Sequence, residues 1–168
     1  MIILGIDPGT ATTGYGLLDV KENGFSVIEY GLIETDKNHN SRKRLSEIYK
    51  ELSFIIKKFG PDCMSMEKIF FATNAKTAIA VGQAQGVMML CAYKHKLELF
   101  EYAPGTIKKQ ISGNGRSDKK MMQKAVRKIL GPKIKSKKRQ KTHFDDSADA
   151  LAIALCHAVN IGTIKIKI

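Results

Sequence analysis

Three short apolar runs open the chain and predict three β-strands. They cover residues 2–6, 13–20 and 25–35, separated only by a Gly/Thr-rich segment and a Lys-Glu-Asn-Gly turn. Short connections of this kind join antiparallel neighbours, because a parallel pair needs a crossover of a dozen or more residues. The first part of the chain therefore predicts an antiparallel meander.

The remaining pattern alternates between helices and strands. Apolar residues recur with i, i+3, i+4, i+7 spacing over residues 41–59, and Gly60-Pro61 ends that helix. The later segments predict, in order, a strand over 63–70, a helix over about 74–96, a strand over 97–104, a loop at 113–116, a basic helix over 117–130, a cationic connector at 133–141 and an apolar helix from about 144. This order predicts an α/β fold, a five-stranded mixed sheet flanked by helices. No boundary divides it, so we expect one domain over residues 1–160 and a short basic tail over 161–168.

Four carboxylates interrupt this apolar pattern. Asp7 ends the first strand, Glu67 lies in the fourth, and Asp146 and Asp149 lie in the last helix. Acids are rarely buried unless they are paired, hydrogen-bonded or bound to a metal ion. Three separate apolar elements that each carry such an acid suggest one shared cation site, with Asp7 and Glu67 on adjacent central strands and the acidic helix packed across them.

The helical pair carries most of this prediction. Residues three apart on a helix are about 60° apart around its axis, so Asp146 and Asp149 point the same way and repel each other. A divalent ion would remove that repulsion, and Mg²⁺ and Mn²⁺ are the ions that commonly take such carboxylates as ligands. Asp145 and Asp146 can alternatively cap the helix N-terminus. Asp149 lies a full turn further in, where capping does not explain it.

The net charge of +12 is concentrated in one segment. Residues 101–141 hold 14 Lys or Arg against Glu101 and Asp118, whereas the rest of the chain balances 14 bases with 14 acids. A basic surface beside an acidic pocket suits a polyanion that binds through its phosphates, although a solvated basic face remains the alternative. Three cysteines without CxxC spacing and the lack of a long apolar run predict a cytoplasmic protein that does not enter a membrane.

Four sequence blocks together resemble the RuvC family of Holliday-junction resolvases. They are GIDPGTATTGYG, MEKIFFATNAKTAIAVGQAQG, YAPGTIKKQISGNGRSDK and DSADALAIALCH, and they extend from Ile3 to about Ala158. The resemblance implies a ribonuclease H-like fold and a homodimeric, Mg²⁺- or Mn²⁺-dependent endonuclease. Such an enzyme cuts two strands of a four-way DNA junction symmetrically in recombination and repair. It also implies the branch-migration proteins RuvA and RuvB as partners.

The resemblance extends to individual residues. Asp7, Glu67, Asp146 and Asp149 match the family's catalytic and metal-binding acids, with Asp145 as an additional acid beside them. His143 is a metal ligand or proton carrier by this resemblance, or simply a solvated side chain. The expected DNA contacts are an aromatic near the crossover, two lysines near the scissile phosphate and further cations: Phe70, Lys108, Lys119, Arg116, Lys137, Lys138 and Arg139.

The chemistry of phosphodiester hydrolysis fits four acids. Two divalent ions roughly 3.5–4 Å apart can activate water and stabilise the leaving 3′ oxygen. We expect Asp7 to bridge the two ions, Glu67 and Asp146 to complete separate ions and Asp149 to lie beside them. The products would carry 5′-phosphate and 3′-hydroxyl ends.

Three rival functions share some of these features. An actin-like ATPase also uses a D-x-G-T motif, but it needs a second lobe and a second phosphate loop. A nuclease of ribosomal RNA precursors (YqgF-like) would lack the extended basic segment, and a DNA-structure binding module would carry vestigial acids. The small residues Ala78, Gly82 and Gly86 suggest a dimer interface, or else the face that packs on the protein's own sheet.

Overall fold

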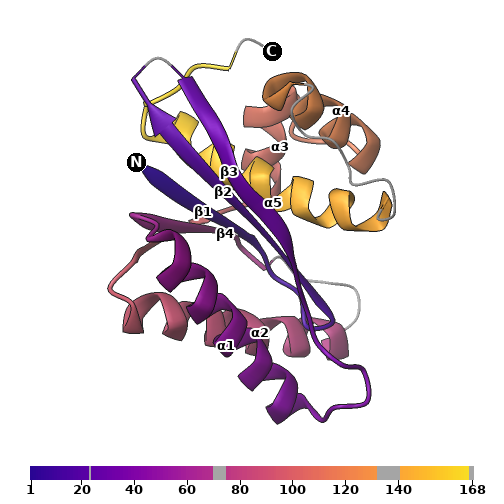
Figure 1. Ribbon diagram of the computed structural model, residues 1–168. Coiled ribbons are helices and arrows are strands. Elements are labelled where there is room, and N and C mark those ends of the chain that lie inside the picture. The colour runs from indigo at the N-terminus through magenta and orange to yellow at the C-terminus, as the bar shows by residue number, and fades with distance from the viewer. Residues whose placement is uncertain (23, 70–74, 132–140, 167–168) are drawn as a thin grey trace.

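The computed structural model describes residues 1–22, 24–69, 75–131 and 141–166, without the side chains of residues 75–76 and 141–146. Its strands are β1 (Ile2–Asp7), β2 (Thr12–Lys21), β3 (Gly24–Glu34), β4 (Cys63–Glu67) and β5 (Glu98–Tyr102). Its helices are α1 (Ser41–Phe59), α2 (Ala75–Lys94), α3 (Pro104–Ser112), α4 (Lys119–Leu130) and α5 (Lys141–Asn160). Figure 1 shows the strands between two groups of helices, which makes a three-layer α/β fold.

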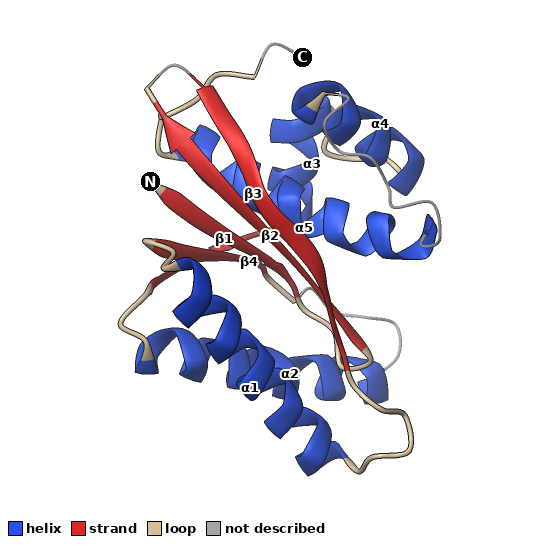
Figure 2. Ribbon diagram, viewed as in Figure 1, coloured by secondary structure: helices blue, strands red, loops and turns tan. Residues whose placement is uncertain are grey.

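The strands form one mixed sheet in the order β3-β2-β1-β4-β5, and Figure 2 labels the first four of these strands. β2 pairs antiparallel with both β1 and β3, and β4 pairs parallel with both β1 and β5. The predicted five-stranded mixed sheet with an initial antiparallel meander is therefore confirmed. β1 and β4 are adjacent central strands, also as predicted.

The two faces of the sheet have different neighbours. Side chains of a strand alternate between faces, so residues two apart share one face. Leu4, Ile6, Met64 and Met66 belong to the buried cluster that contains α1 and α2, whereas Ile3 and Cys63 belong to the cluster that contains α3, α4 and α5. The same alternation assigns Asp7 and Glu67, at the ends of β1 and β4, to the face that α5 covers.

Two glycines allow α5 to pack closely on this face. Gly5 of β1 and Gly16 of β2 are cross-strand partners. A Cβ at Gly5 would lie 2.8 Å from the nitrogen of Ala154, and one at Gly16 would lie 2.7 Å from Cδ2 of Leu151. Only residues without a side chain fit there, so the backbone of α5 lies directly over β1 and β2.

Several predicted boundaries were wrong. β4 ends at Glu67 rather than residue 70, and α2 ends at Lys94 rather than 96. β5 ends at Tyr102, since Pro104 cannot donate a ladder hydrogen bond and instead begins α3, a helix that the sequence analysis missed. Pro104 in the first turn and Gly113 in the left-handed conformation at the end were the available signals for α3.

The end of the chain joins the core. Ile164 is buried and Ile166 packs against the cluster that contains α5, so the described part of the predicted tail lies on the domain. Cys63, Cys91 and Cys156 are buried free thiols. Among the described helices, none has the length and apolar character needed to cross a membrane.

Candidate active site

Three of the four predicted acids line one pocket of about 210 Å³. Asp7 and Glu67 reach it from the carboxyl ends of the parallel strands β1 and β4, and Asp149 reaches it from the helix α5 that crosses them. Ligands of α/β sheets commonly bind at the carboxyl ends of parallel strands. The predicted convergence of acids from three elements is therefore present in the fold.

The acids influence one another electrostatically. The pKa of Glu67 is raised, mainly because burial disfavours its charged form and also because the Asp149 carboxylate lies nearby. Lys108 acts in the opposite direction and lowers the pKa of Glu67. Asp149 has its own cationic neighbour, since Lys119 Nζ lies 3.7 Å from its Oδ2. The pocket thus concentrates negative charge that two lysines only partly offset.

A small hydroxyl network fixes the segment between these lysines. Lys108 lies on α3 and Lys119 is the first residue of α4. The hydroxyls of Ser112 and the buried Ser117 are 2.6 Å apart, and either of them can donate to the other. The hydroxyl that accepts this bond keeps its own proton for a main-chain carbonyl, which is Lys108 O at 2.7 Å for Ser112 or Asn114 O at 2.8 Å for Ser117. These bonds tie the end of α3 to the beginning of α4 and hold both lysines at the pocket wall.

The turn after Asp7 is also held by side chains. Thr13 Oγ1 donates a 2.7 Å hydrogen bond to the carbonyl of Gly9, and Thr35 Oγ1 donates one of 2.7 Å to the carbonyl of Thr10. Both acceptors are main-chain oxygens of the turn that leaves β1. The Asp7 backbone is therefore restrained by the sheet on one side and by this turn on the other.

A neutral pair includes Tyr102 at the end of β5, beside the pocket acid Glu67. Tyr102 pairs in register with Glu67, and its hydroxyl lies 2.7 Å from Nδ1 of the buried His157. Burial raises the pKa of Tyr102 to about 12 and lowers the pKa of His157. The pair therefore stays uncharged near neutral pH and adds no cation that would compete for the acids.

The other predicted residues lie in different places. Arg116 is exposed in the loop before α4, where its backbone N–H donates to Asn114 Oδ1 at 3.0 Å, and it does not line the pocket. The backbone of α5 includes positions 143, 145 and 146. Outside the described residues or side chains lie Phe70, Lys137, Lys138, Arg139, His143, Asp145 and Asp146.

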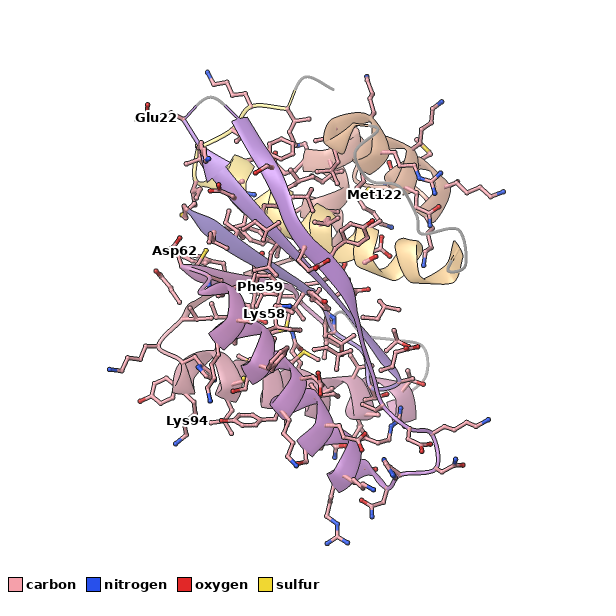
Figure 3. All side chains as sticks on the ribbon, in the orientation of Figure 1. Glu22, Lys58, Phe59, Asp62, Lys94 and Met122 are labelled. Atoms are coloured by element: carbon pink, nitrogen blue, oxygen red, sulfur yellow. The ribbon has the colours of Figure 1, made fainter. Side chains whose placement is uncertain are left out.

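The apolar walls of the pocket are not predicted by the sequence pattern. Ile107 of α3, Met122 of α4 and Ile153 of α5 line it together with Pro104 and Ala152. Figure 3 shows Met122 in the helical layer opposite α1, whose end carries Lys58 and Phe59. The periodicity of α4 and α5 identifies such residues as core positions, but it does not indicate which of them border the acids.

The donor set fits a hard divalent cation. Asp7, Glu67 and Asp149 offer only carboxylate oxygens, the ligands that Mg²⁺ and Mn²⁺ prefer. Burial and, to a smaller extent, the Asp149 carboxylate raise the pKa of Glu67, and a bound cation would offset both effects by favouring the charged carboxylate. Within the described side chains, no three acids, histidines or cysteines form a complete ion-binding cluster by themselves. Asp146, the fourth acid of the predicted set, lies outside those side chains.

A mixed sheet in this order, with acids at the ends of β1 and β4 opposed by lysines, defines a nuclease of the ribonuclease H-like class. The family profile described as "Crossover junction endodeoxyribonuclease RuvC" matches residues 3–157. The chain belongs to this RuvC family, whose members are metal-dependent nucleases.

Individual relatives agree with this assignment. The chain is 46% identical over 158 residues to the crossover junction endodeoxyribonuclease RuvC of Alkaliphilus oremlandii, covering 94% of this chain and 93% of that protein. The structure of Thermus thermophilus RuvC superimposes with a TM-score of 0.82 at 29% identity, covering 98% of this chain and 99% of the other. T. thermophilus RuvC in complex with a Holliday junction substrate gives a TM-score of 0.81 at 26% identity, with the same coverage of 98% and 99%.

Proposed function

We propose that this protein resolves four-way DNA junctions by cutting two strands symmetrically, leaving 5′-phosphate and 3′-hydroxyl ends, in recombination and repair in the cytoplasm. The observation that carries the proposal is the convergence of Asp7, Glu67 and Asp149 in one pocket whose wall includes Lys108 and Lys119. The solved complex of T. thermophilus RuvC with a Holliday junction substrate supports the choice of DNA.

Asp7, Glu67, Asp149 and Asp146 would hold Mg²⁺ or Mn²⁺, with two ions per site. When bound, such ions supply Lewis acidity that lowers the pKa of water and stabilises the leaving oxygen. Asp7 ends β1, the middle strand of the sheet, and lines the same pocket as Glu67 and Asp149, so its carboxylate would hold metal together with theirs. His143 stays a candidate ligand or proton carrier on the first turn of α5.

The lysines and the apolar walls complete the site. Lys108 and Lys119 present cations to the same pocket as the acids, so they can bind the oxygens of the scissile phosphate. The 3.7 Å pair between Lys119 and Asp149 neutralises part of the acidic charge before DNA arrives. Ile107 and Met122 exclude bulk water from one side of the pocket, which strengthens these charge interactions.

The basic segment supplies the wider DNA contacts in this proposal. Arg116 is exposed beside the lysine that begins α4. Lys137, Lys138 and Arg139 would bind phosphates, and Phe70 would stack on a base near the crossover, a contact worth about 1–3 kcal/mol. RuvA and RuvB are the proposed partners that bring the junction to the enzyme, by family resemblance.

The proposed enzyme acts as a two-fold symmetric dimer through α2. An apolar stripe follows one side of this helix, where the exposed fractions are 64% for Ile79, 50% for Leu90 and 78% for Tyr93. Gly82 and Gly86 lie on the same side; among the described residues, a Cβ at Gly82 would meet Ile69 alone, at 3.8 Å, and one at Gly86 would meet no atom within 4 Å. These two glycines therefore do not pack on the protein's own sheet. A second copy would cover the stripe and provide the second cut.

A cleavage assay on a synthetic four-way junction tests the function. With Mg²⁺ or Mn²⁺ we expect paired nicks at symmetric positions that DNA ligase can seal, and with EDTA we expect binding without cleavage. Linear duplex DNA and a precursor ribosomal RNA are the controls. Metal-dependent cleavage of the RNA but not of the junction would favour the ribosomal RNA nuclease, and junction binding without cleavage in any metal would favour a binding module.

A further inference from the structure

One polar side chain of α2 reaches from the helical layer to the acid at the end of β4. Gln85 is 7% exposed, and its Nε2 donates a 3.0 Å hydrogen bond to the main-chain carbonyl of Glu67. The same nitrogen lies 3.4 Å from Oε1 of Glu101 on β5. Around it, the buried side of α2 is apolar, with Ala84, Met88 and Cys91.

The hydrogen bond from Gln85 meets Glu67 at the end of strand β4. Glu67 is the last residue of β4, and the next N–H, that of Lys68, still donates to the carbonyl of Tyr102 on β5 at 2.9 Å. Gln85 binds the Glu67 carbonyl from α2. The peptide unit that follows Glu67 is thus held at both its oxygen and its nitrogen. A buried amide costs free energy unless it is hydrogen-bonded, so an apolar residue would be the ordinary choice on this side of α2.

We propose that Gln85 is a positioning residue for the metal-holding carboxylate of Glu67. By fixing the peptide that follows Glu67, Gln85 fixes the direction in which this side chain enters the pocket shared with Asp7 and Asp149. Small displacements of a ligand weaken metal binding strongly, because the first ligands depend on the groups that orient them. The inference rests on the proposed function only in assigning Glu67 to the metal site.

The contact also joins two parts of the proposed enzyme. Gln85 is one residue before Gly86, which lies on the exposed stripe of α2. The helix that would meet the second copy therefore carries the hydrogen bond to the active-site acid.

Direct Mn²⁺ binding by the DNA-free, full-length protein tests the inference. The loss of the electron paramagnetic resonance signal of free Mn²⁺ measures binding without any cleavage. For Gln85→Met, which keeps the side-chain length and removes the donor, we expect about tenfold weaker Mn²⁺ binding. Gln83→Met is the matched control, because Gln83 is exposed on the same helix, and it should bind Mn²⁺ within about twofold of the wild type.

Junction cleavage measured against Mn²⁺ concentration distinguishes a misplaced Glu67 carboxylate from a general loss of structure. Gln85→Met should need about tenfold more Mn²⁺ for half-maximal junction cleavage and should recover most of the wild-type rate at saturating Mn²⁺, with junction binding in EDTA unchanged. A rate that stays low at saturating Mn²⁺, or Mn²⁺ binding equal to that of Gln83→Met, would overturn the proposal. If Gln85→Met does not fold, Gln85→Asn, whose amide is one methylene shorter, should show the same weaker Mn²⁺ binding, and its failure to do so would equally overturn it.

The Glu101→Gln variant tests which of the two acceptors near Gln85 Nε2 affects Mn²⁺ binding. If the Glu67 carbonyl is the functional acceptor, Glu101→Gln should bind Mn²⁺ within about twofold of the wild type. A tenfold loss in this variant would instead assign the effect to the pair of Gln85 and Glu101. A wild-type protein that binds Mn²⁺ but does not cut the junction would refute the proposed function and still leave the Gln85 test in force.

Discussion

Gly5 of β1 lies so close to the backbone of Ala154 in α5 that a Cβ at position 5 would be 2.8 Å from the Ala154 nitrogen. Asp7 is two residues beyond Gly5 on the same face of the sheet, and Asp149 is on the same helix as Ala154. The close approach therefore also sets how near the strand acid and the helix acid can come. The absence of a side chain at Gly5 therefore influences the distance between Asp7 and Asp149.

Replacing Gly5 should destabilise the fold. In Gly5→Ala the new methyl has no space, because both the main chain and the side chain of α5 occupy it, and overpacking of this kind typically costs about 1–3 kcal/mol or more. Urea denaturation followed by circular dichroism measures the loss. Gly105→Ala on α3 is the control, since its Cβ would make only an ordinary 3.9 Å contact, and it should lose little or no stability. Equal stability of the two variants would contradict the close packing of α5.

Asp7→Asn should abolish cleavage and keep junction binding. The substitution preserves size and removes the charge that a metal ion needs, while the basic segment stays intact. We expect the cleavage rate to fall by at least about 10²–10³-fold. Gel-shift binding in EDTA and single-turnover cleavage in Mg²⁺ measure the two effects.

Asp145→Asn is the comparison on the last helix and should keep most of the activity. If it is as inactive as Asp146→Asn, the assignment of Asp146 and Asp149 as the helix acids is wrong. Equal loss of binding and cleavage in Asp7→Asn would instead make Asp7 a structural residue.

The metal-free protein should be stabilised by Glu67→Gln near neutral pH. Burial and Asp149 raise the folded-state pKa of Glu67 above its unfolded value, so the folded state binds a proton more tightly than the unfolded state does. The tighter proton binding stabilises the folded state. This stabilisation is fully present below the unfolded pKa of Glu67 and is lost as pH rises through its raised folded pKa. In EDTA, Glu67→Gln should therefore melt at a higher temperature than the wild type at pH 7, and this advantage should disappear below the ordinary value of 4.5. A constant difference at all pH values would exclude this titration as its cause.

Junction binding should weaken steeply with salt. Each neutralised phosphate releases counterions, and the slope of log K against log [salt] is about −0.9 per phosphate contact on duplex DNA. Replacing Lys137, Lys138 and Arg139 by Ala should make the slope shallower by up to about 2.7. The control replaces three exposed lysines of α1, in the opposite helical layer, and should leave the slope unchanged: Lys50, Lys57 and Lys58. An unchanged slope in the first variant would place the phosphate contacts elsewhere.

The dimer should depend on the stripe along α2. Within the described part of the chain, a Cβ at Gly86 would meet no atom within 4 Å, so a leucine side chain has space there in one chain and would collide with a second copy. At micromolar concentration we expect the wild type to sediment as a dimer and Gly86→Leu as a folded monomer. Lys128→Leu on α4, an exposed position in the other helical layer, should remain dimeric. A folded, dimeric Gly86→Leu would move the interface away from this side of α2.

Local patterns were enough to predict much of the site. The alternation within a strand fixes which residues share a face, so Asp7 and Glu67 could be placed together once their strands were predicted to be neighbours. The spacing of three between Asp146 and Asp149 places both on one side of a helix whatever that helix packs against. The surplus of positive charge in residues 101–141 is a property of composition and needs no fold at all.

Other features depend on how elements meet in space. The hydrogen bond from Gln85 to Glu67 joins residues 18 apart, and the pair of Lys119 and Asp149 joins residues 30 apart. α3 was missed because its apolar residues, Ile107 and Ile111, make too short a pattern to identify a nine-residue helix. Periodicity describes a single element, whereas these contacts depend on the distances between elements.

By itself, then, the sequence determined the order of the strands and of the helices other than α3, the acids and the basic segment, because those follow from the local periods of 2 and 3.6 residues and from composition. Only the tertiary structure decided that Asp149 comes within reach of Glu67, that Ile107 and Met122 form the walls, and that Gln85 holds the end of β4. The physical reason is that each of these contacts depends on how closely two elements approach in space; for Asp149 that approach is the packing of α5 on Gly5 and Gly16, where no side chain separates the helix from the sheet.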